Sequence, residues 1–267
     1  MGIAGWWDTV DSGGMKVLLM LGLCMGTLMA DGPKDWSRML DKKQIEKDGK
    51  TLNYRFGTVG EGEKLPLLVF LHGAGERGGD NAAQLKHGVK DLVAWCKKEE
   101  QGCHILVPQC PRNGWWSNTE GNFKDPKGIT MKADPAWTLS LVFQVVDGLL
   151  AKGGVDGDRI YITGLSMGGY GTFDAVSRRP EFFAAAMPVC GGGDPKQASS
   201  IKNLPMWVFH GGRDNVVPPE MSRVMVEAVK EAGGKPKYRE YPEAGHDSWS
   251  ATYSDPDVWA WLFAQKR

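Results

Sequence analysis

The sequence has no excess of either charge, because 32 Lys and Arg residues balance 32 Asp and Glu residues. Without a basic surplus, nothing favours nucleic acid or an anionic membrane surface as a partner. Cysteines are few, five in 267 residues, and none has the spacing of a zinc site. Internal repeats, low-complexity tracts and interdomain linkers are also lacking. We therefore expect a globular α/β chain with no metal and no cofactor.

One apolar run stands near the N-terminus. Lys16 precedes residues 17–30, which have signal-peptide length and are too short to cross a bilayer comfortably. We interpret residues 1–30 as upstream residues plus a signal peptide, and residues 31–267 as a single domain. A membrane-anchoring helix is the alternative. The first interpretation predicts a secreted or periplasmic protein with no stable membrane anchor after cleavage.

Four cysteines follow that segment, and two interpretations of them stay open. Cys96 and Cys103 could form a disulfide across a short turn in an oxidising compartment. Alternatively these two, together with Cys110 and Cys190, are small buried apolar residues.

Apolar runs alternate with amphipathic segments along the rest of the chain. A polar lead-in at 31–50 and an edge strand at 52–57 come first. Continuous apolar runs predict buried strands, which we place at 65–71, 104–108, 159–163, 182–189 and 205–209, with a short strand at 237–241. Helical spacing predicts helices, which we place at 92–98, 136–152, 170–179, 219–232 and 257–265. The alternation predicts an α/β fold with a mostly parallel central sheet and helices on both faces.

The turn at 164–168 reads Gly-Leu-Ser-Met-Gly, between a predicted strand and a predicted helix. This context is typical of the nucleophile elbow, a strained turn that exposes a serine hydroxyl at the edge of a sheet. The helix that follows directs its positive N-terminal end at the same place. Ser166 is the predicted nucleophile.

Two more strand ends supply the partners that a serine nucleophile needs. Asp214 follows the strand at 205–209, and His246 follows the strand at 237–241. Because ligands bind beyond the carboxyl ends of parallel strands, these side chains are expected to meet Ser166. His246 would take the hydroxyl proton, and Asp214 would orient the imidazole. Asp194 is a rival for the role of the acid.

A tetrahedral oxyanion also needs preorganised donors. The Met167 N–H, at the start of the helix, is one candidate. The Ala74 N–H, in the glycine-rich loop after the strand at 65–71, is the other. His72 and His210 also occupy strand ends, but each precedes a glycine turn, so both are expected to be structural.

Four segments carry a family resemblance, namely 71–78, 108–111, 164–171 and 245–249. They resemble α/β-hydrolases of the polyhydroxybutyrate-depolymerase-like and predicted-peptidase kind, whose relatives include feruloyl esterases, dienelactone hydrolases and the phospholipase/carboxylesterase group. The resemblance covers about residues 50–265. It implies the α/β-hydrolase fold, Ser166, Asp214 and His246 as the catalytic triad, and Ala74 and Met167 as oxyanion donors.

The substrate is expected to be a small-molecule or polymer-attached ester. Only residues 190–204 separate two strands where many lipases carry a lid, so we expect no large lid. The long segment 110–135 should cover the site instead, with Trp115 and Trp116 as substrate contacts or as packing residues. Trp249, close after His246, is a further expected contact. The sequence thus predicts an exported serine carboxylesterase for acetyl or feruloyl esters, with a serine peptidase or a catalytically silent binding protein as alternatives.

Overall fold

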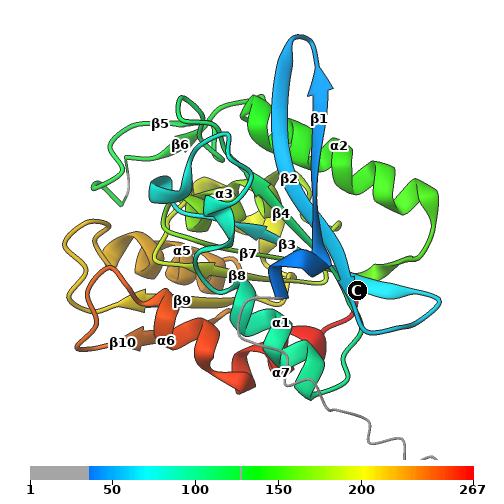
Figure 1. Cartoon of the computed structure of the whole chain (residues 1–267). Coiled ribbons are helices and arrows are strands. Elements are labelled where there is room, and N and C mark those ends of the chain that lie inside the picture. The colour runs from blue at the N-terminus through cyan, green and yellow to red at the C-terminus, as the bar shows by residue number, and fades with distance from the viewer. Residues whose placement is uncertain (1–35, 127) are drawn as a thin grey trace, which may run out of the picture. The chain divides into compact units, whose positions relative to one another are not determined.

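An eight-stranded sheet runs through the computed structural model, which describes residues 36–126 and 128–267 (Figure 1). The predicted targeting segment at 1–30 lies outside the described residues. In spatial order the strands are β1 (Leu40–Lys47), β2 (Lys50–Val59), β4 (Cys103–Gln109), β3 (Leu65–Leu71), β7 (Val155–Leu165), β8 (Ala185–Val189), β9 (Trp207–Gly211) and β10 (Lys237–Tyr241). The pairs β1–β2 and β2–β4 are antiparallel, and all the others are parallel.

Helices cover both faces of this sheet. One face carries α2 (Trp137–Lys152), α3 (Met167–Arg178), α4 (Ala198–Ile201) and α5 (Glu220–Glu231). The other carries α1 (Val89–Lys98), α6 (Trp249–Ser254) and α7 (Pro256–Phe263), which Figure 1 shows together below the sheet. Short 3-10 turns are η1 (Trp36–Met39), η2 (Ala74–Glu76), η3 (Ala83–Leu85) and η4 (Pro195–Gln197). This is the predicted α/β arrangement.

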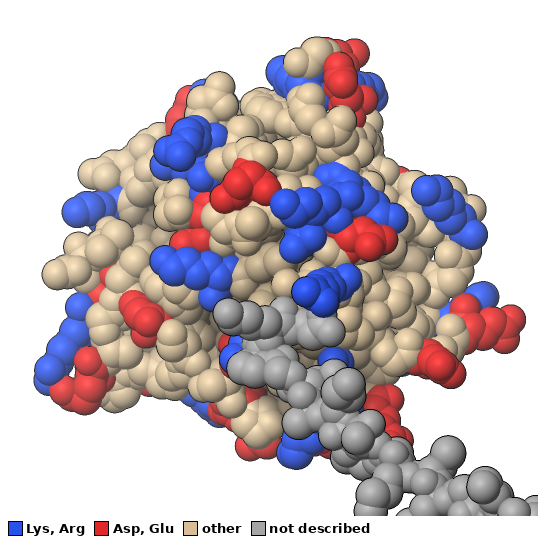
Figure 2. Space-filling model, viewed as in Figure 1, with Lys and Arg blue, Asp and Glu red and all other residues tan. Residues whose placement is uncertain are grey.

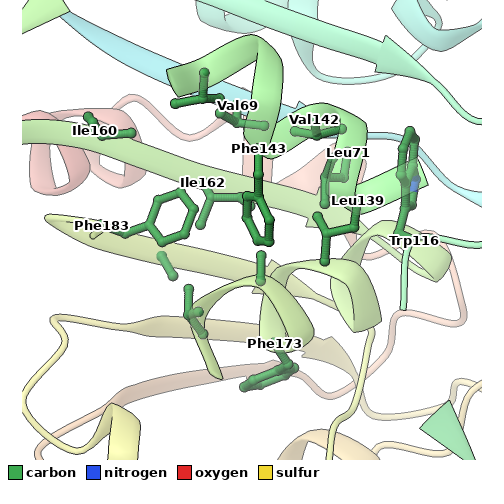
Figure 3. Packing of buried hydrophobic residues seen from close by; sticks show 14 of the residues in the cluster. Val69, Leu71, Trp116, Leu139, Val142, Phe143, Ile160, Ile162, Phe173 and Phe183 are labelled. Carbon is green, nitrogen blue, oxygen red and sulfur yellow. The ribbon is translucent and has the colours of Figure 1, made fainter. Parts of the chain in front are cut away.

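Each covered face has its own hydrophobic core. On one side, Ile162 of β7 and Leu71 of β3 belong to the same cluster as Phe143 of α2 and Phe173 of α3 (Figure 3). On the other, strand residues such as Phe70 pack against α1 and the C-terminal helices. Because β3 is buried along its whole length, both of its faces must be apolar, which explains its continuous hydrophobic run.

The lead-in predicted at 31–50 is wrong in part, because Leu40–Lys47 forms the edge strand β1. Most of its side chains are exposed, so it lacks the apolar alternation that would identify a half-buried strand. Asp48 and Gly49 join it to β2, and both have positive φ, 53° and 69°. Asp-Gly is a favoured pair for such a hairpin turn, so the local signal for the hairpin was present.

The predicted absence of a large lid agrees with the structure, since η4 and α4 are the only helical elements between β8 and β9. The long connection after β4 contains a two-stranded hairpin, β5 (Thr119–Glu120) and β6 (Thr130–Met131). Acidic and basic side chains lie interspersed over the face shown in Figure 2. Within the part of the chain that the structure describes, no helix is long and apolar enough to span a bilayer.

The four described cysteines, including Cys96 and Cys103, are buried and unbridged. Of the two interpretations, the structure therefore corresponds to the one in which the cysteines are small buried apolar residues, not to the one with a Cys96–Cys103 disulfide.

Candidate active site

Ser166 occupies a strained turn between β7 and α3. Its backbone has φ 53° and ψ −115°, a conformation that a non-glycine residue rarely adopts. The surrounding glycines allow the turn, because a Cβ on Gly164 would lie 2.7 Å from the carbonyl oxygen of Leu71 and one on Gly168 would overlap the same carbonyl. The end of β3 thus packs directly against the start of α3. The tight packing leaves the Ser166 hydroxyl at the carboxyl end of the sheet.

The structure brings the three predicted residues together. The Ser166 Oγ atom lies 2.9 Å from His246 Nε2, and His246 Nδ1 lies 2.6 Å from Asp214 Oδ2. An ionised carboxylate cannot donate, so Nδ1 carries the hydrogen and Nε2 is free to accept the serine proton. Ser166 and His246 are partly exposed, whereas Asp214 is buried. This arrangement can remove a proton from an alcohol that faces solvent.

Asp214 is held as an anion by a dense set of donors. Its Oδ1 accepts hydrogen bonds from the amides of Val216 and Val217, at 2.9 and 3.0 Å. Burial alone would raise the pKa of this carboxyl, but the hydrogen bonds from His210, His246 and the two amides outweigh burial and hold the pKa well below its usual range. Asp214 therefore stays ionised when His246 takes up a proton.

The rival acid, Asp194, serves the long loop instead. It accepts hydrogen bonds from the amides of Met131 in β6 and of Lys196, both at 3.0 Å. Asp174 of α3 does the same for the amide of Asn118, also at 3.0 Å. Two buried carboxylates thus fasten the loop to the body of the molecule.

The two predicted oxyanion donors each begin a helical segment. Met167 is the first residue of α3 and Ala74 the first of η2, positions whose N–H groups have no partner within the helix. Gly73 packs against Leu165, since a Cβ there would lie 2.8 Å from the Leu165 side chain. The packing keeps the η2 amides close to the elbow.

His72 holds the glycine-rich loop after β3 in place, in agreement with the structural role predicted for it. Its Nδ1 donates to the Gly73 carbonyl at 2.6 Å, and its Nε2 accepts from the Cys110 amide at 2.9 Å. Burial lowers the pKa of His72 to about 4, opposed by the Gly73 hydrogen bond and assisted by the nearby Arg77 charge. The ring is therefore neutral and ties the end of β3 to the end of β4.

The two predicted tryptophans, Trp115 and Trp116, differ in their exposure to solvent. Trp115 is 40% exposed and stacks on Phe123 with ring centroids 5.3 Å apart. Trp116 is fully buried, and its Nε1 donates to the His72 carbonyl at 3.0 Å. The expectation that Trp116 contacts substrate is therefore wrong, because its ring fills the core under the loop. Trp249 is partly exposed and lies edge-on to His246, with ring centroids 5.2 Å apart.

A metal does not fit the site. Cys190, Asp214 and His246 bring three ligand-type atoms within 4.8 Å of one another. Burial raises the pKa of the Cys190 thiol far above its ordinary value, so the thiolate that binds metals is disfavoured. Both Asp214 oxygens already accept hydrogen bonds. The cluster is better described as packing behind the acid.

His210 lies beside Asp214, a contact that the sequence did not predict. It was expected to be only structural, yet its Nε2 lies 3.3 Å from Asp214 Oδ2. The available signal was its spacing, because His210 comes four residues before Asp214 at the end of the same strand.

Comparisons with known proteins show what the chain is similar to. A family model described as Phospholipase/Carboxylesterase matches residues 58–255. A solved structure described as a thermostable esterase is 40% identical, with a TM-score of 0.75 over 86% of this chain and 64% of that chain. A bifunctional acetylxylan esterase/xylanase of Neocallimastix patriciarum is 34% identical over 153 residues, 57% of this chain and 20% of that protein. An uncharacterized secreted protein of Arthroderma benhamiae is 29% identical over 216 residues, 68% of this chain and 21% of that protein.

This chain spans between about a fifth and a half of the length of the first curated relatives that it matches. The family model covers most of this chain, because it extends from β2 to the residue before α7. The matched segment includes Ser166, Asp214 and His246. The chain belongs to the phospholipase/carboxylesterase family of α/β-hydrolases.

Proposed function

We propose that this protein is a serine carboxylesterase in which Ser166, His246 and Asp214 form the catalytic triad. The observation that carries the proposal is the pair of contacts from Ser166 Oγ to His246 Nε2, 2.9 Å, and from His246 Nδ1 to Asp214 Oδ2, 2.6 Å. These are hydrogen-bond distances between residue types whose protonation allows proton transfer in sequence.

The reaction has two halves. His246 takes the hydroxyl proton as Ser166 Oγ attacks the ester carbonyl carbon, and the resulting imidazolium then protonates the departing alkoxide. Water repeats the sequence on the acyl-enzyme, giving the carboxylic acid and free serine. Asp214 keeps its negative charge throughout and stabilises the imidazolium. The Ala74 and Met167 amides receive the oxyanion, where one donor is typically worth about 3–4 kcal/mol.

The proposed substrate class rests on the small number of residues between β8 and β9 and on the side chains of the long loop after β4. Without a large lid, the site suits an ester that projects from a larger molecule. Trp115 and Phe123 border a surface hollow of about 580 Å³, lined also by Lys50, Asn113, Asn118 and Trp137. Aromatic faces beside amide side chains suit an aromatic acyl group or a sugar ring. We therefore assign acetyl or feruloyl groups carried by a polysaccharide as the substrate class, which the acetylxylan esterase relative supports.

Export is part of the proposal. Residues 17–30 have the composition of a signal peptide, and one relative is described as secreted. Expression of the full chain in a bacterial host, followed by mass spectrometry of the extracellular and periplasmic fractions, should find a mature protein that starts near residue 31. An intact N-terminus retained with the membrane would contradict this.

The decisive test compares the wild type with Ser166→Ala. A fluorophosphonate should label the wild type on Ser166 and leave the variant unlabelled. The wild type should hydrolyse aryl acetates and methyl ferulate, and the variant should lose this activity. Hydrolysis of peptide amides without ester hydrolysis would favour a peptidase. No labelling at all would favour a silent binding protein.

A further inference from the structure

His210 lies directly behind the proposed triad acid. It is the fourth of the five residues of β9 and is fully buried. Its Nε2 lies 2.9 Å from the Val217 carbonyl oxygen and 3.3 Å from Asp214 Oδ2. Neither a carbonyl nor an ionised carboxylate can donate, so the hydrogen must be on Nε2. It forms a hydrogen bond with the Val217 carbonyl and lies close enough to Asp214 Oδ2 to stabilise that anion.

The other ring nitrogen is anchored as well. His210 Nδ1 lies 2.7 Å from Ser222 Oγ in α5, and that hydroxyl lies 2.9 Å from the Gly191 carbonyl oxygen. Both Nδ1 and the carbonyl are acceptors here, so the Ser222 hydroxyl shares its one hydrogen between them. Ser222 is itself fully buried. The ring is thus fixed from α5 on one side, while its Nε2–H points at the acid on the other.

We propose that His210 is a positioning residue for the reaction, which holds Asp214 Oδ2 in line with His246 by donating its Nε2–H. This inference rests on the proposed function. The two amides of Val216 and Val217 bind only Oδ1, whereas Oδ2 is approached by the rings of His246 and His210. Because two imidazoles approach Oδ2, this oxygen keeps its position while His246 exchanges a proton first with Ser166 and then with the leaving group.

The same contact moderates the charge that His246 feels. When His210 no longer donates, Asp214 Oδ2 interacts with His246 alone, and the imidazolium form of His246 becomes more favourable. The acid limb of kcat/KM, where activity depends on neutral His246, should then move to higher pH. The loss of alignment should lower kcat by about 10- to 100-fold, because small misplacements of catalytic groups are costly.

Other titratable groups lie near the two rings, and none of them is substituted in the test. Cys190 follows β8 and lies close to Asp214 and His246. Glu240 on β10 is the strand neighbour of His210, and its carboxylate is bound by Arg223 and Tyr238. Asp247 is occupied by the amide and hydroxyl of Ser250.

The test pairs His210→Leu with His210→Gln. Leucine removes the donor, whereas the glutamine amide can still donate from about the same position. We expect His210→Leu to lower kcat per fluorophosphonate-labelled site with KM nearly unchanged, and to move the acid limb upward by roughly half a pH unit. His210→Gln should recover most of both. His104→Leu is the matched control. The His104 ring, on β4, has hydrogen bonds to Thr58 and to the Gly154 carbonyl, neither of which belongs to the site.

Ser222→Ala provides an independent variant, since it frees the ring without removing it. It should lower kcat several-fold and move the acid limb in the same direction, and it carries the test if His210→Leu does not fold. The inference would be overturned if Ser222→Ala and His210→Leu both kept the wild-type kcat per labelled site and the wild-type midpoint of the acid limb. Equal losses in the leucine and glutamine variants would also overturn it. A wild type that does not react with the fluorophosphonate would instead overturn the proposed function.

Discussion

Trp115 and Trp116 are adjacent in sequence but lie on opposite sides of the loop that carries them. The Trp115 ring is 40% exposed and stacks on Phe123, whereas the Trp116 ring is fully buried against His72. One tryptophan is therefore available to a ligand, and the other holds the loop on the body of the protein.

Replacement of Trp115 should change substrate preference. We expect Trp115→Ala to lower kcat/KM for methyl ferulate about 5- to 10-fold more than for an aryl acetate, because an aromatic acyl group loses a stacking partner. Initial rates on the two esters measure the effect. Equal losses on both would indicate that Trp115 only packs the loop.

Replacement of Trp116 should change stability instead. The Trp116→Ala variant removes a large core side chain together with the hydrogen bond to His72, so we expect the free energy of unfolding to fall by about 3–5 kcal/mol. Denaturant titration measures this loss. A variant with wild-type stability and altered ester preference would contradict the buried role.

The Ala74 amide can be removed without a change in charge. Gly73 is extended, with φ −78° and ψ 177°, which suits the residue before a proline, and Ala74 opens a helical turn where proline is tolerated. Ala74→Pro should therefore lower kcat about 100- to 1,000-fold through the loss of one oxyanion donor. Ala74→Gly keeps the N–H and is the control. Similar activity in both variants would exclude this amide as a donor.

Asp214→Asn should lower kcat on the order of 1,000- to 10,000-fold, because an amide presents the wrong group to His246. Its NH₂ would also meet the Nε2–H of His210, donor against donor, at the position where Oδ2 accepts from both rings. Active-site titration with steady-state rates separates this loss from incomplete folding. Retention of activity would reassign the acid.

His72 should make the fold sensitive to acid. Its pKa is about 4 in the folded protein against an ordinary 6.5, so between these values the unfolded chain binds a proton that the folded chain does not. The free energy of unfolding should thus fall by up to about 3 kcal/mol as the pH is lowered from 6.5 to 4. His72→Gln should flatten this part of the stability profile, and an unchanged slope would contradict the buried neutral ring.

The sequence determined the elements and the order of the candidate residues. Apolar runs predicted the buried strands because β3 and its neighbours must be apolar on both faces, and the elbow motif predicted Ser166 because only glycines permit the close approach of β3 and α3. These are local requirements, so a local pattern records them. The strand β1 was not predicted, because an exposed edge strand needs little alternation of apolar and polar residues.

Tertiary structure alone decided the contacts between distant segments. Nothing in the sequence distinguished Trp115 from Trp116, because burial depends on which side of the loop meets α3 and the His72 carbonyl. For His210 the four-residue spacing to Asp214 was a local signal, but the orientation of its ring depends on Ser222 of α5 and on the Gly191 carbonyl in the loop after β8. Such contacts form between residues far apart in the chain, and no short-range periodicity encodes them.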